Sequence, residues 1–285
     1  MKKIYALIAE SIALLLISCG GAGRPDPGES ARLYGARASF DFTSGNLLGA
    51  LAEYRKAYTA AARVDLPLEQ AQCLFNIGRV NYELGRLDSA GDAFSAAYRD
   101  FIYFGDPGGA AFAAGFLALV NLQASKYDSA FAWYGRGRPK KVFSGNAETA
   151  FWLTVQAQLC IMKDRIPEAM GYLDRAMESY KEEKMYSGMA QVDYYRAAVA
   201  FSSAKYDDAR AALASSLALL DKSPERYRRW HVLLAAATVS FCLHDEEAGV
   251  RYYTRAVDCV PKGIVTPPPI DSVRTCPAKW WEHYR

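Results

Sequence analysis

The sequence predicts an all-α protein, a helix-hairpin solenoid of about six repeated units. From Ala31 onward the chain consists of long amphipathic runs rich in Ala, Leu and Tyr, without the alternation that marks β-strands. Within these runs a short pattern returns with a period near 40 residues. A fixed period of this length is typical of stacked repeats, each too small to bury its apolar face alone.

The repeated pattern is a small residue, a large apolar residue four positions later and a second small residue three positions beyond that. It begins at Ala50, Ala90, Ala130, Ala169, Ala209 and Gly249, with successive spacings of 40, 40, 39, 40 and 40. Residues with this spacing share one stripe of a helix. The small side chains let a second helix approach closely, and the large one fills the groove beside them.

A partner helix is predicted about twelve residues before each of these positions, most clearly in AQCLFNIGRVNYELG, residues 71–85. Carboxylates fall in the first turn of the second helices, where they favour the helix dipole, and Pro167 suits the first helical position. These carboxylates belong to Asp88, Asp128, Glu168 and Asp207. Each unit is therefore predicted to be a helical hairpin.

The second unit resembles the tetratricopeptide repeat (TPR). The matching residues are Leu74, Ile77, Gly78 and Tyr82 on the first helix, Gly85 at the turn, and Leu87, Ala90, Phe94 and Ala97 on the second. The other units match more loosely, with alanine where the family prefers glycine. The resemblance covers residues 31–262. Because the period exceeds the roughly 34 residues of the family, it implies longer helices or loops in each unit.

Residues 1–18 are predicted to be a signal peptide. Lys2 and Lys3 precede an apolar stretch that Glu10 interrupts, so the segment falls short of the roughly 20 apolar residues that span a bilayer. The sequence LISC, residues 16–19, resembles the lipobox of bacterial lipoproteins. The resemblance implies a diacylglycerol on Cys19 and a lipid anchor in the cell envelope, with the outer membrane favoured over the inner. An ordinary secretory signal with an incidental cysteine is the alternative.

Both ends of the mature chain differ in composition from the repeats. Residues 19–30 are rich in Gly and Pro and are predicted to form a flexible tether. Residues 263–285 begin with a run of prolines and end with Trp280, Trp281 and Tyr284. Since the ends of a solenoid must be covered, we predict that this tail caps the last hairpin or lies in the groove.

The charge balance and the motifs exclude several classes of function. Loss of residues 1–18 lowers Lys plus Arg from 34 to 32 and Asp plus Glu from 31 to 30, so no basic stripe indicates a nucleic-acid partner. The three histidines lack metal-ligand spacing, and there is neither a GxSxG motif nor a phosphate-binding loop. We therefore expect no enzymatic activity, no cofactor and no metal.

Most of the six cysteines are not expected to form disulfides. Cys73, Cys160 and Cys242 lie in apolar helical stretches, where cysteine usually behaves as a small buried hydrophobe. Cys259 and Cys276 flank the proline run, and export would permit a disulfide between them. That pairing is a hypothesis, which the sequence leaves open.

The TPR resemblance implies a binding surface on the concave side, lined by the first helix of each hairpin. The resemblance places Phe75 on this surface, and we predict contact with a partner or ligand at positions in the second to fifth units, namely Asn76, Arg79, Phe112, Phe116, Phe151, Gln158, Tyr194 and Tyr195. This set is aromatic and mostly uncharged, which favours an apolar ligand or an apolar partner helix. The alternative is that these aromatic residues pack between hairpins.

Two functions follow as expectations. The first is a membrane-anchored TPR scaffold that binds another envelope protein, or a peptide segment, within an envelope assembly. The second is a ligand-binding accessory lipoprotein of a periplasmic uptake system, which would hold a small apolar molecule on the aromatic surface.

Overall fold

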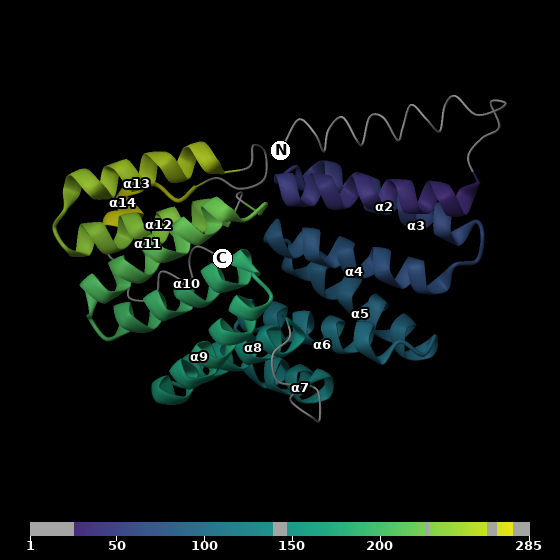
Figure 1. Ribbon diagram of the computed structural model, residues 1–285, viewed down its shortest axis with the longest axis horizontal. Coiled ribbons are helices and arrows are strands. Elements are labelled where there is room, and N and C mark those ends of the chain that lie inside the picture. The colour runs from purple at the N-terminus through teal and green to yellow at the C-terminus, as the bar shows by residue number, and fades with distance from the viewer. Residues whose placement is uncertain (1–25, 139–146, 226–227, 261–266, 276–285) are drawn as a thin grey trace.

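The computed structural model describes residues 26–138, 147–225, 228–260 and 267–275, and within these ranges the regular elements are all helices (Figure 1). They pair as α2 (Pro27–Ser44) with α3 (Leu47–Ala62), α4 (Pro67–Glu83) with α5 (Leu87–Tyr103), α6 (Pro107–Gln123) with α7 (Tyr127–Gly137), α8 (Ala147–Met162) with α9 (Ile166–Glu182), α10 (Tyr186–Ser202) with α11 (Tyr206–Lys222), and α12 (Arg229–Cys242) with α13 (Glu246–Cys259). A short helix, α14 (Ile270–Arg274), follows. The predicted all-α solenoid of helical hairpins is confirmed.

The repeated stripe forms the core of the hairpins. Its first small residue is fully buried in five units, at Ala50, Ala90, Ala130, Ala169 and Ala209. The large residue four positions later is also fully buried at Phe94, Leu173 and Leu213. In the second hairpin a Cβ atom on Gly78 would lie 2.7 Å from the Phe94 ring, so only glycine allows this approach. The small–large–small pattern in the sequence therefore marks the residues at which the two helices of a hairpin contact each other.

The turn inside each hairpin repeats with the same period as the stripe. Its central residue has a left-handed backbone, at Gly45, Gly85, Ser125, Asp164, Ala204 and His244. The next residue donates its backbone N–H to the carbonyl five positions back, as Arg86 does to Asn81 at 2.9 Å and Lys205 to Ala200 at 2.9 Å. This bond satisfies a carbonyl that the helix end leaves without a partner. Each second helix therefore starts at a fixed distance from its turn.

The hairpins stack into a curved solenoid with two arms, which meet at α6–α9 (Figure 1). From α4 to α10, the first helices of successive hairpins approach one another more closely than the second helices do. Since the inside of a bend is its shorter side, the first helices lie on the inner side. The Arg228 guanidinium, just before α12, pairs with Glu83 at the end of α4, across 145 residues of sequence.

The ends of the solenoid refine the predicted boundaries. Helix α2 begins at Pro27, with Asp26 as its N-cap, so residues 27–30 are helical and do not belong to a tether. A proline preset for the first helical turn explains the early start. The signal peptide and residues 19–25 of the predicted tether, Cys19 included, lie outside the described residues. No helix in the described part of the chain combines the length and apolarity of a membrane span.

The described part of the C-terminal tail lies on the last hairpin. Val273 of α14 is fully buried in the apolar cluster that α12 builds with its neighbours. The Tyr253 hydroxyl donates to the Pro268 carbonyl at 2.8 Å. The aromatic residues predicted to complete the cap, Trp280, Trp281 and Tyr284, lie outside the described residues.

The cysteines correct two predictions. Cys73 and Cys160 are buried with free thiols, and burial with Glu69 nearby raises the pKa of Cys73 to about 11. Cys259 is also free, so the hypothesis of a Cys259–Cys276 disulfide is wrong. Cys242 is disulfide-bonded instead, although we predicted a small buried hydrophobe there. It is the last residue of α12 and only half-buried.

Candidate functional site

Four phenylalanine rings connect three first helices on the inner side. Phe75 of α4 lies 5.4 Å from Phe116 of α6, and Phe116 lies 5.4 Å from Phe151 of α8, measured between ring centroids. Phe112 of α6 lies 5.6 Å from Phe151. All four side chains are half-buried, and we call them the aromatic row. Phe75 and Phe116 also contact the fully buried Phe94 ring of α5, with centroids 5.6 and 5.0 Å away. The rings therefore pack between hairpins, and their contact with a partner or ligand stays a prediction.

Two predicted surface residues are not accessible. Gln158 is only 4% exposed, and its side-chain amide donates to the Thr154 carbonyl one turn earlier at 3.4 Å. Tyr195 is 8% exposed and packs with Leu173 and Val192 in the core around α9 and α10. Both lie on central helices that neighbouring hairpins enclose. The prediction that they line an open surface is therefore corrected.

Tyr194 remains half-buried on α10, beside Tyr195. The polar groups around it hold the hairpins together. The Asp193 carboxylate accepts a hydrogen bond from Ser215 of α11 at 2.6 Å and pairs with Arg196 at 3.1 Å. Arg196 also pairs with Asp174 of α9 at 2.6 Å. The Asp193 and Arg196 side chains of α10 are therefore engaged in packing, and Tyr194 is one of its two half-buried tyrosines, with Tyr186.

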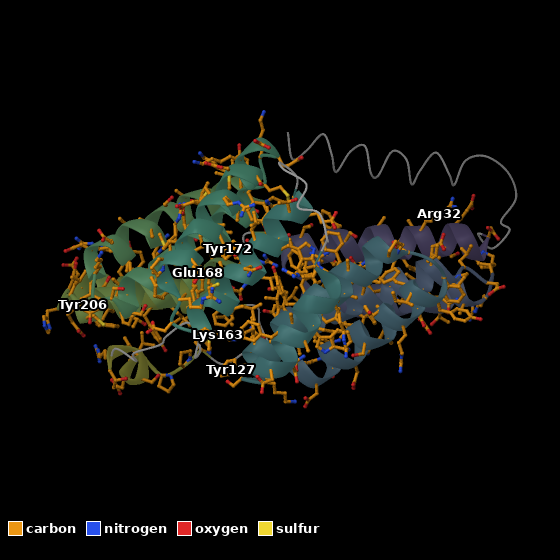
Figure 2. The ribbon with its side chains drawn as sticks, turned by 90° about the horizontal axis from the view of Figure 1, so that it is seen from below. Arg32, Tyr127, Lys163, Glu168, Tyr172 and Tyr206 are labelled. Atoms are coloured by element: carbon orange, nitrogen blue, oxygen red, sulfur yellow. The ribbon has the colours of Figure 1, made fainter. Side chains whose placement is uncertain are left out.

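Asn76 and Arg79 lie on α4 beside the first hairpin, and both are half-buried. The Arg79 guanidinium lies 4.7 Å from the centroid of the Phe42 ring, a cation–π contact. Asn76 lines a hollow of about 210 Å³ between α2 and α4, together with Gln72 and Ser39. We call this the polar hollow. Arg32 also lines it, and Figure 2 shows Arg32 projecting from α2.

Sequence reasoning missed most of the polar hollow. Arg32 and Ser39 lie 40 residues before Gln72 and Arg79, so the same period that located the repeats places them on the same face of their helices. Extending the register to the first hairpin would have found them. The Glu83–Arg228 ion pair has no such signal, because it depends on the curvature of the whole stack.

The chemistry of the inner side is that of recognition. The aromatic row offers apolar contact, and the amides of Gln72 and Asn76 are able to donate to and accept from a peptide backbone. Within the described ranges, no group of three or more His, Cys, Asp or Glu side chains is placed to hold a metal ion.

No protein-family model and no curated protein matches the sequence. Solved structures do match the fold. The Rap conjugation gene regulator of plasmid pLS20, in complex with the Phr* peptide, is 16% identical with a TM-score of 0.70, over 90% of this chain and 69% of that one. The chain has a TPR-like fold.

Two further structures share this fold. The apo form of RapI is 10% identical with a TM-score of 0.64, and the match covers 90% of each chain. BtubC from P. vanneervenii is 13% identical with a TM-score of 0.50, over 78% of this chain and 91% of that one. At these identities the likeness concerns the fold alone.

Proposed function

We propose that this TPR-like solenoid is a lipid-anchored scaffold that binds a segment of another envelope protein on its inner side. The observation that carries the proposal is the aromatic row, four half-buried rings that run across three first helices. A surface of this kind suits an apolar peptide or one face of an amphipathic helix. The Rap regulator, which shares the fold, was solved with a peptide bound.

The polar hollow supports a peptide rather than a small molecule. It lies between α2 and α4, and most of its exposed lining is apolar, with the amides of Asn76 and Gln72 as groups that a peptide backbone would hydrogen-bond. The rings of the row pack on one another with centroids 5.4 to 5.6 Å apart, so they form a continuous, partly exposed apolar strip across α4, α6 and α8. An extended segment covers such a surface, whereas a small apolar ligand requires an enclosing pocket.

A photo-crosslinking residue at position 112 tests the scaffold proposal in cells. We expect it to form adducts with a defined partner, and Phe151→Ala should reduce their yield. The same crosslinker at Tyr103, which is 82% exposed at the end of α5, is the control for random encounter. Equal adduct patterns at the two positions would contradict the proposal.

The uptake alternative has its own test. Native mass spectrometry of the chain without residues 1–19 should give the apo mass if the scaffold proposal is correct. A retained small molecule that is lost in a Tyr194→Ala, Phe151→Ala variant would favour a ligand-binding role instead.

The lipid anchor is a separate proposal, which rests on the LISC sequence before the tether. Acyl chains contribute about 0.8 kcal/mol per buried methylene, so a lipidated Cys19 would hold the protein at a membrane surface. Cys19→Ala should move the protein from the membrane fraction to the soluble fraction. If the variant stays with the membrane, Cys19 is not the anchor.

A further inference from the structure

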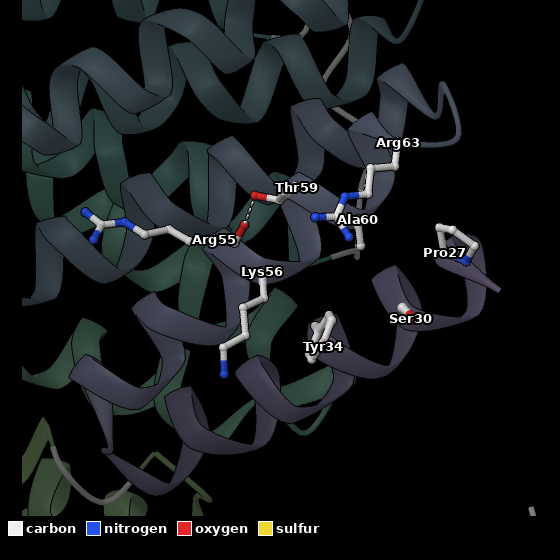
Figure 3. Close-up of a pocket in the computed structure, with 8 residues that line it drawn as sticks. All are labelled: Pro27, Ser30, Tyr34, Arg55, Lys56, Thr59, Ala60 and Arg63. Atoms are coloured by element: carbon white, nitrogen blue, oxygen red, sulfur yellow. Dashed lines mark hydrogen bonds between the residues drawn. The ribbon is translucent and has the colours of Figure 1, made fainter. Parts of the chain in front are cut away.

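Among the described helices, none packs against the outer side of the first hairpin, and a hollow of about 700 Å³ opens there between α2 and α3 (Figure 3). Its charged lining residues are all cations: Arg55, Lys56 and Arg63 from α3. Tyr34 and Ser30 of α2 form the opposite wall. We call this the basic hollow. The basic hollow is separate from the polar hollow, which lies between α2 and α4. It is also separate from the aromatic row, which lies on α4, α6 and α8.

The cations of the basic hollow are only partly neutralised. Lys56 pairs with Glu53 at 2.5 Å and lies 5.8 Å from the centroid of the Tyr34 ring. Arg55 and Arg63 are exposed, and neither forms an ion pair with another described residue. The lining of the basic hollow therefore presents positive charge, while the acidic residues of the same hairpin lie outside that lining, at Asp26, Glu29, Asp41, Glu53 and Asp65.

The position of the basic hollow relative to Cys19 suggests which kind of surface binds there. Pro27, the first residue of α2, lies in its lining, so the chain from Cys19 joins the solenoid at the rim. Residues 19–25 span at most about 25 Å when fully extended, at roughly 3.5 Å per residue. A lipid on Cys19, as the proposed function requires, would keep the basic hollow within that distance of a bilayer.

We propose that the basic hollow docks the first hairpin on an anionic phospholipid surface, with Arg55, Lys56 and Arg63 against the headgroup phosphates. Basic clusters held near anionic leaflets gain about fivefold in binding per cation, and arginine is well suited to phosphate oxygens. The inference rests on the proposed lipid anchor for its setting. Such docking would fix the orientation of the solenoid, which a lipid on a tether leaves free.

Vesicle sedimentation tests the proposal with the chain lacking residues 1–19, which keeps every described residue. We expect binding to vesicles that contain phosphatidylglycerol and none to vesicles of phosphatidylcholine alone. Binding should weaken with added salt, because the Debye length shortens. A triple variant, Arg55→Gln, Lys56→Gln and Arg63→Gln, should lose at least about tenfold in partitioning.

A matched triple variant separates the basic hollow from overall charge. Arg99→Gln, Arg175→Gln and Lys205→Gln remove the same charge from exposed positions on other hairpins, and binding should be retained. An equal loss in both variants, equal binding to both kinds of vesicle, or displacement by an equal concentration of inorganic phosphate would overturn the proposal. The assay involves neither the aromatic row nor Cys19, so its failure would leave the scaffold and anchor proposals standing.

Discussion

A residue with a left-handed backbone precedes each second helix. It is the most regular backbone feature of the structure, and the residue types at these positions do not predict it. Glycine occupies it at Gly45 and Gly85, but Ala204 holds a φ of 55° in the fifth hairpin. For a residue with a Cβ atom this conformation costs about 1 to 2 kcal/mol. The turn is retained because its backbone hydrogen bond and the packing of both helices outweigh that cost.

Replacing Ala204 with glycine should therefore stabilise the protein. We expect Ala204→Gly to raise the free energy of unfolding by about 0.5 to 1 kcal/mol, since relief of strain exceeds the entropy cost of glycine. Ala211→Gly, at an exposed position inside α11, should lower it by about 1 kcal/mol. Urea denaturation measures both changes. A lower free energy of unfolding in both variants would show that the turn is unstrained.

Two buried acidic groups make stability depend on pH in the alkaline range. Burial raises the pKa of Cys73 from 9.0 to about 11 and that of Tyr180 from 10.0 to about 12. In both cases folding favours the neutral form, so their contribution is complete below the unfolded pKa and is lost as pH rises through the folded one. We expect the free energy of unfolding to fall from about pH 9 upward. Urea denaturation of Cys73→Ala should show a shallower fall between pH 9 and pH 10, and an unchanged slope would contradict this.

At the scale of elements, the hairpins could be predicted because their determinants are local. The stripe, the first-turn carboxylates and Pro167 act within one or two helices, so their spacing in the sequence carries over into the structure. The burial of Gln158 and Tyr195 could not be read in this way. It depends on how tightly neighbouring hairpins enclose α8 and α10, which no single repeat encodes.

The Glu83–Arg228 ion pair, which joins the end of α4 to the residue before α12, is the longest-range of these features. A double-mutant cycle with Glu83→Ala and Arg228→Ala should give a coupling energy of about 1 kcal/mol, the upper end for partly exposed pairs. Small-angle scattering should show a larger radius of gyration for Glu83→Ala. Asp221→Ala, which breaks the Arg229–Asp221 pair between successive helices, should leave the radius unchanged. The same radius in all variants would mean that the pair does not hold the arms together.

At the scale of the molecule, the C-terminal segment should stabilise the last hairpin. Removing residues 263–285 deletes Val273 and uncovers the apolar cluster of α12, so the melting temperature should fall. Val273→Asp in the full chain should lower the free energy of unfolding by at least about 2 kcal/mol, because it buries a carboxylate. Thermal unfolding checks both variants. An unchanged melting temperature after truncation would show that the tail is no cap.

The contact between Glu83 and Arg228 also bears on how the protein unfolds. A linear stack of repeats is a one-dimensional chain of nearest-neighbour interfaces, and it frays from its ends one unit at a time. The Glu83–Arg228 ion pair joins the second hairpin to the sixth and closes the intervening units into a ring. The opening of any hairpin within this ring therefore also strains the ion pair. Between α4 and α12, hydrogen exchange should therefore show more uniform protection in the unaltered protein than in Glu83→Ala, with fraying retained in the helices outside this span, α2, α3, α13 and α14.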